Sequence, residues 1–132
     1  MNFTDAELAY FQTQRLGRLA TLAADGTLQN NAVGYHPNTD LGTIDIGGWN
    51  LGASRKFRNI AKTGEVAFII DDIASVDPWK VRGIEIRGRA EALTDQEPGS
   101  EHLSPELIRI HPRTIFSWGV EPDAAGLTRR TA

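Results

Sequence analysis

A glycine-rich stretch and the helix predicted after it hold the residues of this chain that are best suited to binding an anion. The stretch is Gly47-Gly48-Trp49-Asn50-Leu51-Gly52, and the helix is predicted over residues 53–62. The positive end of a helix dipole lies at its amino terminus, where acidic side chains are preferred. This helix contains no acidic residue and instead has four cations, namely Arg55, Lys56, Arg58 and Lys62. The charge pattern is therefore unfavourable for an isolated helix.

A bound phosphate would offset these charges. Each cation at the positive end of the dipole costs about 0.3–1 kcal/mol, and each like-charge pair such as Arg55–Arg58 costs about 0.2–0.5 kcal/mol. A phosphate could accept hydrogen bonds from backbone amides at the helix start, from the Ser54 hydroxyl, and from Arg55 and Lys56. A glycine such as Gly48 would let the backbone approach it closely. The pattern is also compatible with a basic surface helix that faces acidic patches elsewhere in the chain.

Other motifs argue against several classes of site. The chain has no cysteine, which excludes disulfides, thiolate metal sites and cysteine nucleophiles. Its histidines, His36, His102 and His111, do not have the spacing of metal ligands, so we expect no metal site. The glycines of residues 47–52 lack the Gly-x-Gly-x-x-Gly spacing, and no alternation of strands and helices surrounds them. A Rossmann dinucleotide site is therefore not expected.

The length and net charge of the chain indicate how many domains it forms and which classes of protein it is unlike. Its 132 residues suffice for one domain, and its net charge of −3 is unlike the basic excess of general nucleic-acid binders. No apolar run approaches the roughly 18 residues of a membrane span, and the polar first residues do not have the form of a signal peptide. We expect a single cytoplasmic domain over residues 1–132 that binds neither nucleic acid nor membranes, with a flexible tail from about residue 121.

The elements that must position the anion site are predicted to be mostly β-strands. A capping box at residues 4–7 begins a short helix, and Asp25-Gly26 predicts a hairpin between two strand-like runs. Residues 82–93 alternate between apolar and charged side chains, as in a strand with one buried face. Strands are predicted at residues 17–23, 28–36, 43–46, 66–70, 82–93, 107–110 and 115–118. Six or seven antiparallel strands with two short helices indicate a mainly β (α+β) domain built as a closed or half-closed barrel.

The order of these motifs resembles that of the pyridoxamine 5′-phosphate oxidase-like split β-barrel superfamily. The resemblance is carried by Ser54-Arg55-Lys56 after the glycine-rich loop, by residues 17–21 with Asp25-Gly26, and by residues 79–82 leading into residues 84–91. Residues 30–34 and the closing segment 108–119 are most similar to the actinobacterial branch that uses coenzyme F420. The resemblance implies an antiparallel split β-barrel that forms a homodimer and binds its cofactor at the subunit interface.

The resemblance also implies which residues contact the cofactor. The phosphate would be held by Ser54, Arg55 and Lys56, the ring would lie against the backbone of Asn31, Val33 and Tyr35, and the ribityl chain would be flanked by Trp49 and Asn50. Trp79 would reach the cofactor of the partner subunit. Together with Gly48, these residues are the predicted cofactor site.

The chain departs from authentic pyridoxamine phosphate oxidases in two places. Those enzymes usually have glutamine after the arginine equivalent to Arg82, where this chain has Gly83. They also end with an arginine-rich segment that has no evident counterpart here. We therefore expect no pyridoxamine phosphate oxidase activity and favour the deazaflavin F420 over FMN.

Three functions remain as hypotheses. The leading one is an oxidoreductase that transfers a hydride between reduced coenzyme F420 and a small organic acceptor. The alternatives are an FMN-dependent oxidoreductase or FMN-binding protein on the same fold, and a non-enzymatic protein that stores, carries or senses the cofactor. Tyr35 and His36 are the candidates for protonating a substrate, although no residue stands out as a catalytic acid. The sequence does not identify the substrate.

Overall fold

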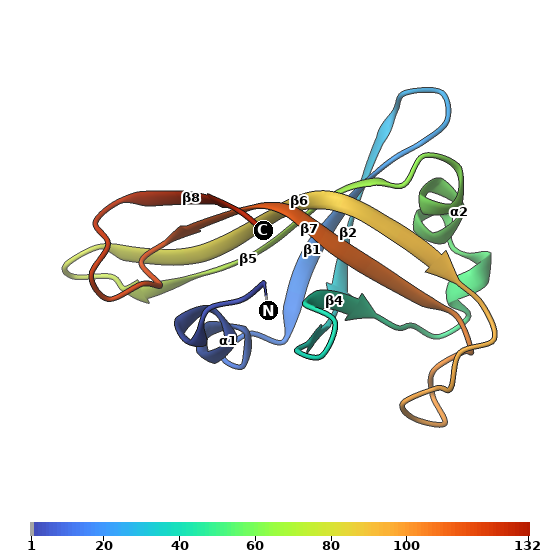
Figure 1. Ribbon diagram of the computed structural model, residues 1–132, viewed down its shortest axis with the longest axis horizontal. Helices are drawn as coiled ribbons and strands as arrows, with labels where there is room; N and C mark the ends of the chain where they lie inside the picture. The colour runs from blue at the N-terminus through green and yellow to red at the C-terminus, as the bar shows by residue number, and fades with distance from the viewer. Residues whose placement is uncertain (1) are drawn as a thin grey trace.

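The computed structural model describes residues 2–132, which form eight β-strands, two α-helices and a short 3-10 helix (Figure 1). In chain order the elements are α1 (Asp5–Phe11), β1 (Leu16–Leu22), β2 (Leu28–Gly34), β3 (His36–Asn38), β4 (Thr43–Ile46), the 3-10 helix η1 (Leu51–Ala53), α2 (Arg55–Lys62), β5 (Glu65–Ser75), β6 (Lys80–Leu93), β7 (Leu107–Trp118) and β8 (Leu127–Thr131). The helix α1 begins with the predicted capping box, in which Thr4 and Glu7 exchange hydrogen bonds. None of the helices within residues 2–132 is long and apolar enough to cross a membrane.

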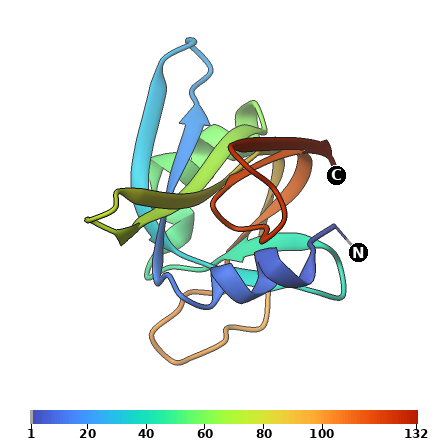
Figure 2. The same cartoon turned by 90° about the vertical axis from the view of Figure 1, so that its left-hand side faces the viewer.

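The sheet curls upon itself. All strand pairs are antiparallel, in the order β2-β1-β5-β6-β7-β4-β3, and β8 also pairs with β7. The strands β2 and β3 stand at the two ends of this order, yet only Tyr35 separates them along the chain. The sheet must therefore bend until its two ends approach each other, which makes it a barrel (Figure 2). The predicted split β-barrel is confirmed.

The barrel splits at β7. Residues 108–110 of this strand pair with β4, whereas residues 114–118 pair with β8. Beyond this point the hairpin end of β5 and β6 projects from the barrel, with the β7–β8 connection beside it (Figure 1). We call residues 71–82 and 118–127 the arm.

The core lies on the inner face of the curled sheet and is rich in isoleucine. On β6, Ile84 and Ile86 are buried while Arg87 and Arg89 are exposed, as the alternation of residues 82–93 predicted. On the same face of the sheet, Phe68 of the adjacent strand β5 and Leu19 of β1 are fully buried as well. The period-two pattern therefore identified the buried face of this strand.

The strands β5 and β7 are longer than predicted because backbone pairing continues past the apolar runs. The strand β5 extends to Ser75, although the apolar run ends at residue 70. The strands predicted on either side of His111-Pro112 form one strand, β7, in which Pro112 lies at a bulge opposite Gly88. A bulge tolerates proline because the ladder there does not need its missing N–H.

The predicted flexible tail is wrong for residues 127–131, which form β8. The guanidinium of Arg130 binds the carboxylate of Glu7 in α1, and one of these hydrogen bonds measures 3.3 Å. Glu7 is buried, so this pair ties the two ends of the chain together. The segment Leu-Thr-Arg-Arg-Thr has little apolar alternation, which is why its sequence did not indicate a strand.

Candidate functional site

The start of α2 lies at the end of the molecule opposite to the arm (Figure 1). Ser54 is the N-cap residue, as serine commonly is. Its hydroxyl accepts a hydrogen bond from the Phe57 amide at 3.3 Å and donates one to the Leu51 carbonyl at 2.6 Å. Ser54 therefore positions the helix start, and its hydroxyl proton is used within the chain.

Two backbone amides at this helix start lack a partner. Within residues 2–132, neither the Arg55 nor the Lys56 N–H donates a hydrogen bond, and neither side chain forms an ion pair. Arg55 is exposed and Lys56 is half-buried. Unpaired amides at a helix start, flanked by two cations, form a donor set that binds phosphate. The residues present therefore fit a cofactor phosphate.

The other two cations of α2 have different surroundings. The guanidinium of Arg58 donates to the Ala53 carbonyl at 3.0 Å, and Lys62 lies in the last turn, where a positive charge is favourable. Hydrogen bonds from Thr27 lower the pKa of Asp25, with a smaller contribution from the charge of Arg55. Within the described chain, no side chain of α2 forms an ion pair with an acid.

The glycine-rich loop presents Trp49 and Asn50 at its tip. The Trp49 side chain is 83% exposed, and Asn50 adopts a left-handed backbone conformation with φ of 52°. Gly48 is half-buried, and its carbonyl accepts hydrogen bonds from the amide and the hydroxyl of Ser104. Because η1 directly precedes α2, this loop leads straight to the predicted phosphate site.

Two of the predicted ring-lining residues, Asn31 and Val33, lie on β2, which pairs with β1 along one edge, and Tyr35 directly follows this strand. Val33 is buried in the core, and Asn31 lies opposite Leu19 on the inner face. These side chains therefore point into the barrel and leave the β2 backbone as the part that a ring could contact. Asn59 of α2 links this region to the helix by donating to Thr21 of β1 at 3.0 Å.

Tyr35, a candidate for protonating a substrate, is held by main-chain hydrogen bonds and by aromatic packing. Its hydroxyl lies 2.8 Å from the Phe11 carbonyl and 2.9 Å from the Gln14 carbonyl, and its ring packs edge-on against Phe11 and Phe68. Burial raises the pKa of Tyr35 to about 12. The hydroxyl proton is therefore directed at main-chain acceptors and is held tightly.

His36 lies at the edge of a cavity that sequence reasoning missed. The cavity has a volume of about 380 Å³ and lies between β3, β4, β7 and the β6–β7 loop. A bidentate ion pair between Asp45 and Arg109 lines it, with both oxygen–nitrogen distances 3.1 Å. Burial raises the pKa of Asp45, but hydrogen bonds from Arg109, Asn38 and Thr43 outweigh it, so the pKa lies below its usual value. These groups come from strands far apart in sequence, and no local motif marks them.

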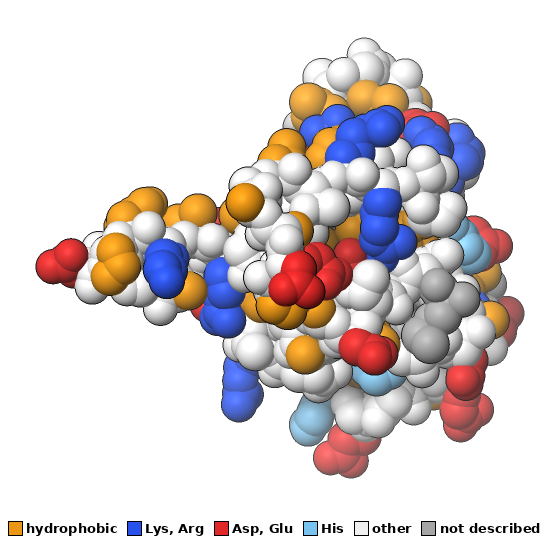
Figure 3. Space-filling view, turned by 60° about the vertical axis from the view of Figure 1, so that its left-hand side comes forward, with side chains coloured by type: hydrophobic (Ala, Val, Ile, Leu, Met, Phe, Trp, Pro, Cys, Tyr) orange, Lys and Arg blue, Asp and Glu red, His pale blue; other side chains and the backbone are white. Residues whose placement is uncertain are grey.

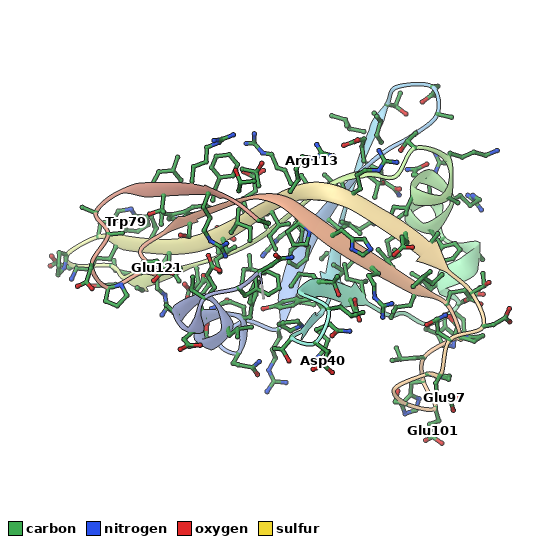
Figure 4. The ribbon with its side chains drawn as sticks, viewed as in Figure 1. Asp40, Trp79, Glu97, Glu101, Arg113 and Glu121 are labelled. Atoms are coloured by element: carbon green, nitrogen blue, oxygen red, sulfur yellow. The ribbon has the colours of Figure 1, made fainter. Side chains whose placement is uncertain are left out.

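Trp79 lies at the tip of the arm, far from α2 (Figure 4). Its side chain is 63% exposed, so it is not the core residue that a tryptophan usually is. Within one chain the structure thus separates Trp79 from the other predicted cofactor residues, which lie toward the opposite end of the molecule.

The structure shows what surrounds the two places where the chain departs from the oxidase pattern, position 83 and the segment after Trp118. Gly83 lies opposite Trp118, and a Cβ at position 83 would lie 2.2 Å from the Trp118 ring, so glutamine does not fit there. Two arginines do follow Trp118, on β8. Arg130 binds Glu7, and Arg129 lies 6.0 Å from the Phe116 ring centre.

Comparison with known proteins extends the resemblance over most of the chain. Residues 3–119 match the family model described as pyridoxamine 5′-phosphate oxidase. The chain is 46% identical over 124 residues, covering 93% of this chain and 87% of the relative, to the 5a,11a-dehydrotetracycline/5a,11a-dehydrooxytetracycline reductase of Streptomyces rimosus.

Solved structures show the same fold at low sequence identity. A conserved hypothetical protein of Mycobacterium tuberculosis superposes with a TM-score of 0.68 at 22% identity, covering 94% of this chain and 92% of that one. A FAD-binding protein of Mycobacterium smegmatis superposes with a TM-score of 0.63 at 20% identity, covering 87% of this chain and 95% of that one.

Proposed function

The chain belongs to the pyridoxamine 5′-phosphate oxidase family, and from that premise we propose that it is an oxidoreductase that transfers a hydride between reduced coenzyme F420 and a small organic acceptor. The observation that carries the proposal is the helix start of α2, where two unpaired amides lie beside two cations without acidic partners. The 46% identity to a protein named as a reductase supports the reaction class. That name also makes 5a,11a-dehydrotetracycline the first acceptor to test.

The roles of this chain's residues follow from their positions. The amides and side chains of Arg55 and Lys56 bind the phosphate, and the exposed Trp49 ring covers the chain that joins the phosphate to the ring system. The backbone of β2 supports the ring system. When bound, the cofactor supplies the hydride chemistry, while the protein orients it and limits its exposure to water.

The deazaflavin is favoured over FMN by the residues on β6 and β7. The space that a glutamine would occupy at position 83 in the oxidases is filled by the Trp118 ring. The polar edge of the ring system must therefore be held differently than in those enzymes. The resemblance of residues 30–34 and 108–119 to the F420 branch points the same way.

The arm supports the proposal of a homodimer with the cofactor at the interface. It exposes apolar side chains that a solvated hairpin does not require, namely Ile73, Val76, Trp79, Val81 and Leu127. Hydrophobic atoms lie along the projecting arm in Figure 3. Large exposed apolar patches mark interaction sites. In the proposed dimer, Trp79 reaches the cofactor bound at α2 of the partner protomer, because its own α2 lies at the opposite end.

The experiment that tests this function is a titration of the cofactor-free protein with F420 and, separately, with FMN. Binding of F420 in the micromolar range, followed by acceptor-dependent oxidation of reduced F420 with 5a,11a-dehydrotetracycline, is the expected result. Uptake of FMN without F420 would favour the flavin alternative. Binding of F420 without turnover of any acceptor would favour a carrier or sensor.

A further inference from the structure

The glycine-rich loop is held in place by two residues of the β6–β7 loop, Ser104 and Glu106. The Ser104 hydroxyl accepts a hydrogen bond from the Leu51 amide at 2.9 Å and donates to the Gly48 carbonyl at 2.9 Å. The Ser104 amide also donates to the Gly48 carbonyl, at 3.0 Å. One side chain therefore fixes the loop on both sides of its exposed tip.

Glu106 fixes the loop one residue closer to α2. Its carboxylate accepts a hydrogen bond from the Gly52 amide at 2.9 Å. A Cβ at position 52 would lie 3.0 Å from the carboxyl carbon and 3.1 Å from its oxygen, so the glycine allows this approach. Glu106 is half-buried, which limits competition from water.

Leu51 connects the Ser104 contact to the start of α2. Its side chain is buried, and its amide is bonded to Ser104. Its carbonyl accepts hydrogen bonds from both the amide and the hydroxyl of Ser54, at 2.9 and 2.6 Å. Ser54 in turn caps α2. The chain of contacts therefore runs from Ser104 through Leu51 and Ser54 to the amides of Arg55 and Lys56.

We propose that Ser104 and Glu106 are positioning residues for the cofactor phosphate, which they do not touch but whose binding loop they hold in shape. The inference rests on the proposed function of the α2 start. A loop with three glycines among residues 47–52 loses much backbone freedom when it is fixed. The contacts from Ser104 and Glu106 fix it before the ligand arrives, which strengthens binding by preorganisation.

The test compares F420 affinity and backbone amide exchange in Glu106→Ala, Glu106→Gln and the wild type. Glu106→Ala should weaken F420 binding about tenfold, roughly the cost of fixing one residue's backbone. The amides of Gly52, Phe57 and Arg58 should exchange faster in the cofactor-free variant. Glu106→Gln keeps an acceptor for the Gly52 amide and should bind F420 at least as well as the wild type. Glu97→Ala, a charge loss on the same loop, is the matched control and should leave both measurements unchanged.

Gly52→Ala gives an independent reading of the same contact. In the wild-type background its methyl group should displace the carboxylate and weaken F420 binding, whereas in the Glu106→Ala background it should add nothing. Equal F420 affinity in the wild type and Glu106→Ala, or equal loss in Glu106→Gln and Glu106→Ala, would overturn the positioning role.

A wild type that does not bind F420 would count against the proposed function and not against the positioning role. In that case the amide-exchange measurement still tests the positioning role of Glu106. Faster exchange that spreads from Gly52 to Phe57 and Arg58 in Glu106→Ala would support the positioning role, and faster exchange confined to Gly52 would overturn it.

Discussion

Among single residues, the four cations of α2 differ in what surrounds them. Lys56 is half-buried beside two unpaired amides, whereas Arg58 donates to the Ala53 carbonyl and Lys62 lies in the favourable last turn. Arg55 is exposed and weakly coupled to Asp25. Lys56 is therefore the cation best placed to lean over a ligand at the helix start.

Replacing Lys56 with alanine should weaken F420 binding about ten- to a hundredfold, because a charge-assisted hydrogen bond contributes roughly 1.5–3 kcal/mol. The stability of the cofactor-free protein should stay the same or rise slightly, since the change removes a charge that opposes the helix dipole. Fluorescence titration and thermal unfolding measure the two effects. Arg58→Ala and Lys62→Ala are the controls and should barely change affinity; equal losses in all three variants would indicate only a diffuse basic surface.

Tyr35→Phe should lower stability by about 1–2 kcal/mol and leave turnover unchanged. The reason is that the hydroxyl proton is already committed to the main-chain carbonyls of Phe11 and Gln14. Chemical denaturation and steady-state kinetics measure these two quantities. A fall in turnover without loss of stability would restore Tyr35 as a candidate acid.

Asp45→Asn should lower stability at neutral pH by about 1–3 kcal/mol, because the buried carboxylate binds Arg109, Asn38 and Thr43. The folded pKa of Asp45 is depressed. The contribution of the ionised Asp45 to folding stability is therefore present above the unfolded pKa of about 3.9, and it is lost as the pH falls through the folded pKa. The difference between wild type and Asp45→Asn in denaturant unfolding should shrink below about pH 4. Asp40→Asn, at an exposed position, is the control. A stability difference between wild type and Asp45→Asn that stays constant at all pH values would contradict the depressed pKa of Asp45.

Among secondary-structure elements, the first and the last, α1 and β8, contact each other through Glu7 and Arg130. Glu7 belongs to the capping box of α1 and is also the buried partner of Arg130 on β8. A buried charge without its partner is strongly destabilising. The two terminal elements therefore depend on each other although they are at opposite ends of the sequence.

Arg130→Ala should destabilise the protein by about 3–5 kcal/mol by leaving the Glu7 carboxylate buried without its cation. Adding Glu7→Gln to this variant should recover part of the loss, because the orphaned charge is then gone. Arg129→Ala, on the neighbouring and exposed position, should cost at most about 1 kcal/mol. Thermal unfolding of the four proteins measures the comparison, and equal effects of the two arginines would show that β8 contributes only generic pairing.

For the whole molecule, the arm and α2 lie at opposite ends (Figure 1). Trp79 on the arm is therefore far from α2 of its own chain, and we expect it to meet a cofactor at α2 only in a partner copy. The apolar side chains on the arm give such an association a contact surface.

We expect sedimentation at micromolar concentration to give about twice the mass of one chain. Trp79→Ala should weaken dimer formation or F420 binding with little loss of protomer stability, since its ring is mostly exposed. A buried tryptophan would instead cost about 3–5 kcal/mol. Leu28→Ala, which removes an exposed apolar side chain at the other hairpin, is the matched control. A monomer that binds F420 as tightly as the predicted dimer would contradict the interface.

The parts that could be predicted from the sequence depend on residues close together along the chain. The capping box at Thr4, the hairpin turn at Asp25-Gly26 and the alternation along β6 each span a few residues. The unusual charges of Arg55 and Lys56 likewise mark the start of α2 without any tertiary information. Local hydrogen bonding and period-two burial are therefore sufficient to determine the fold class and to locate the candidate anion site.

Contacts between distant residues were decided only by the tertiary structure. The partners Gly52 and Glu106 are 54 residues apart, Asp45 and Arg109 are 64 apart, and Glu7 and Arg130 are 123 apart. An alternating pattern shows which face of a strand is buried, but not which strand lies beside it or in what register. The curling of the sheet and the order of its strands bring these distant residues into contact. The sequence therefore pointed to the residues proposed to bind phosphate, whereas the residues proposed to hold their loop became visible only in the closed barrel.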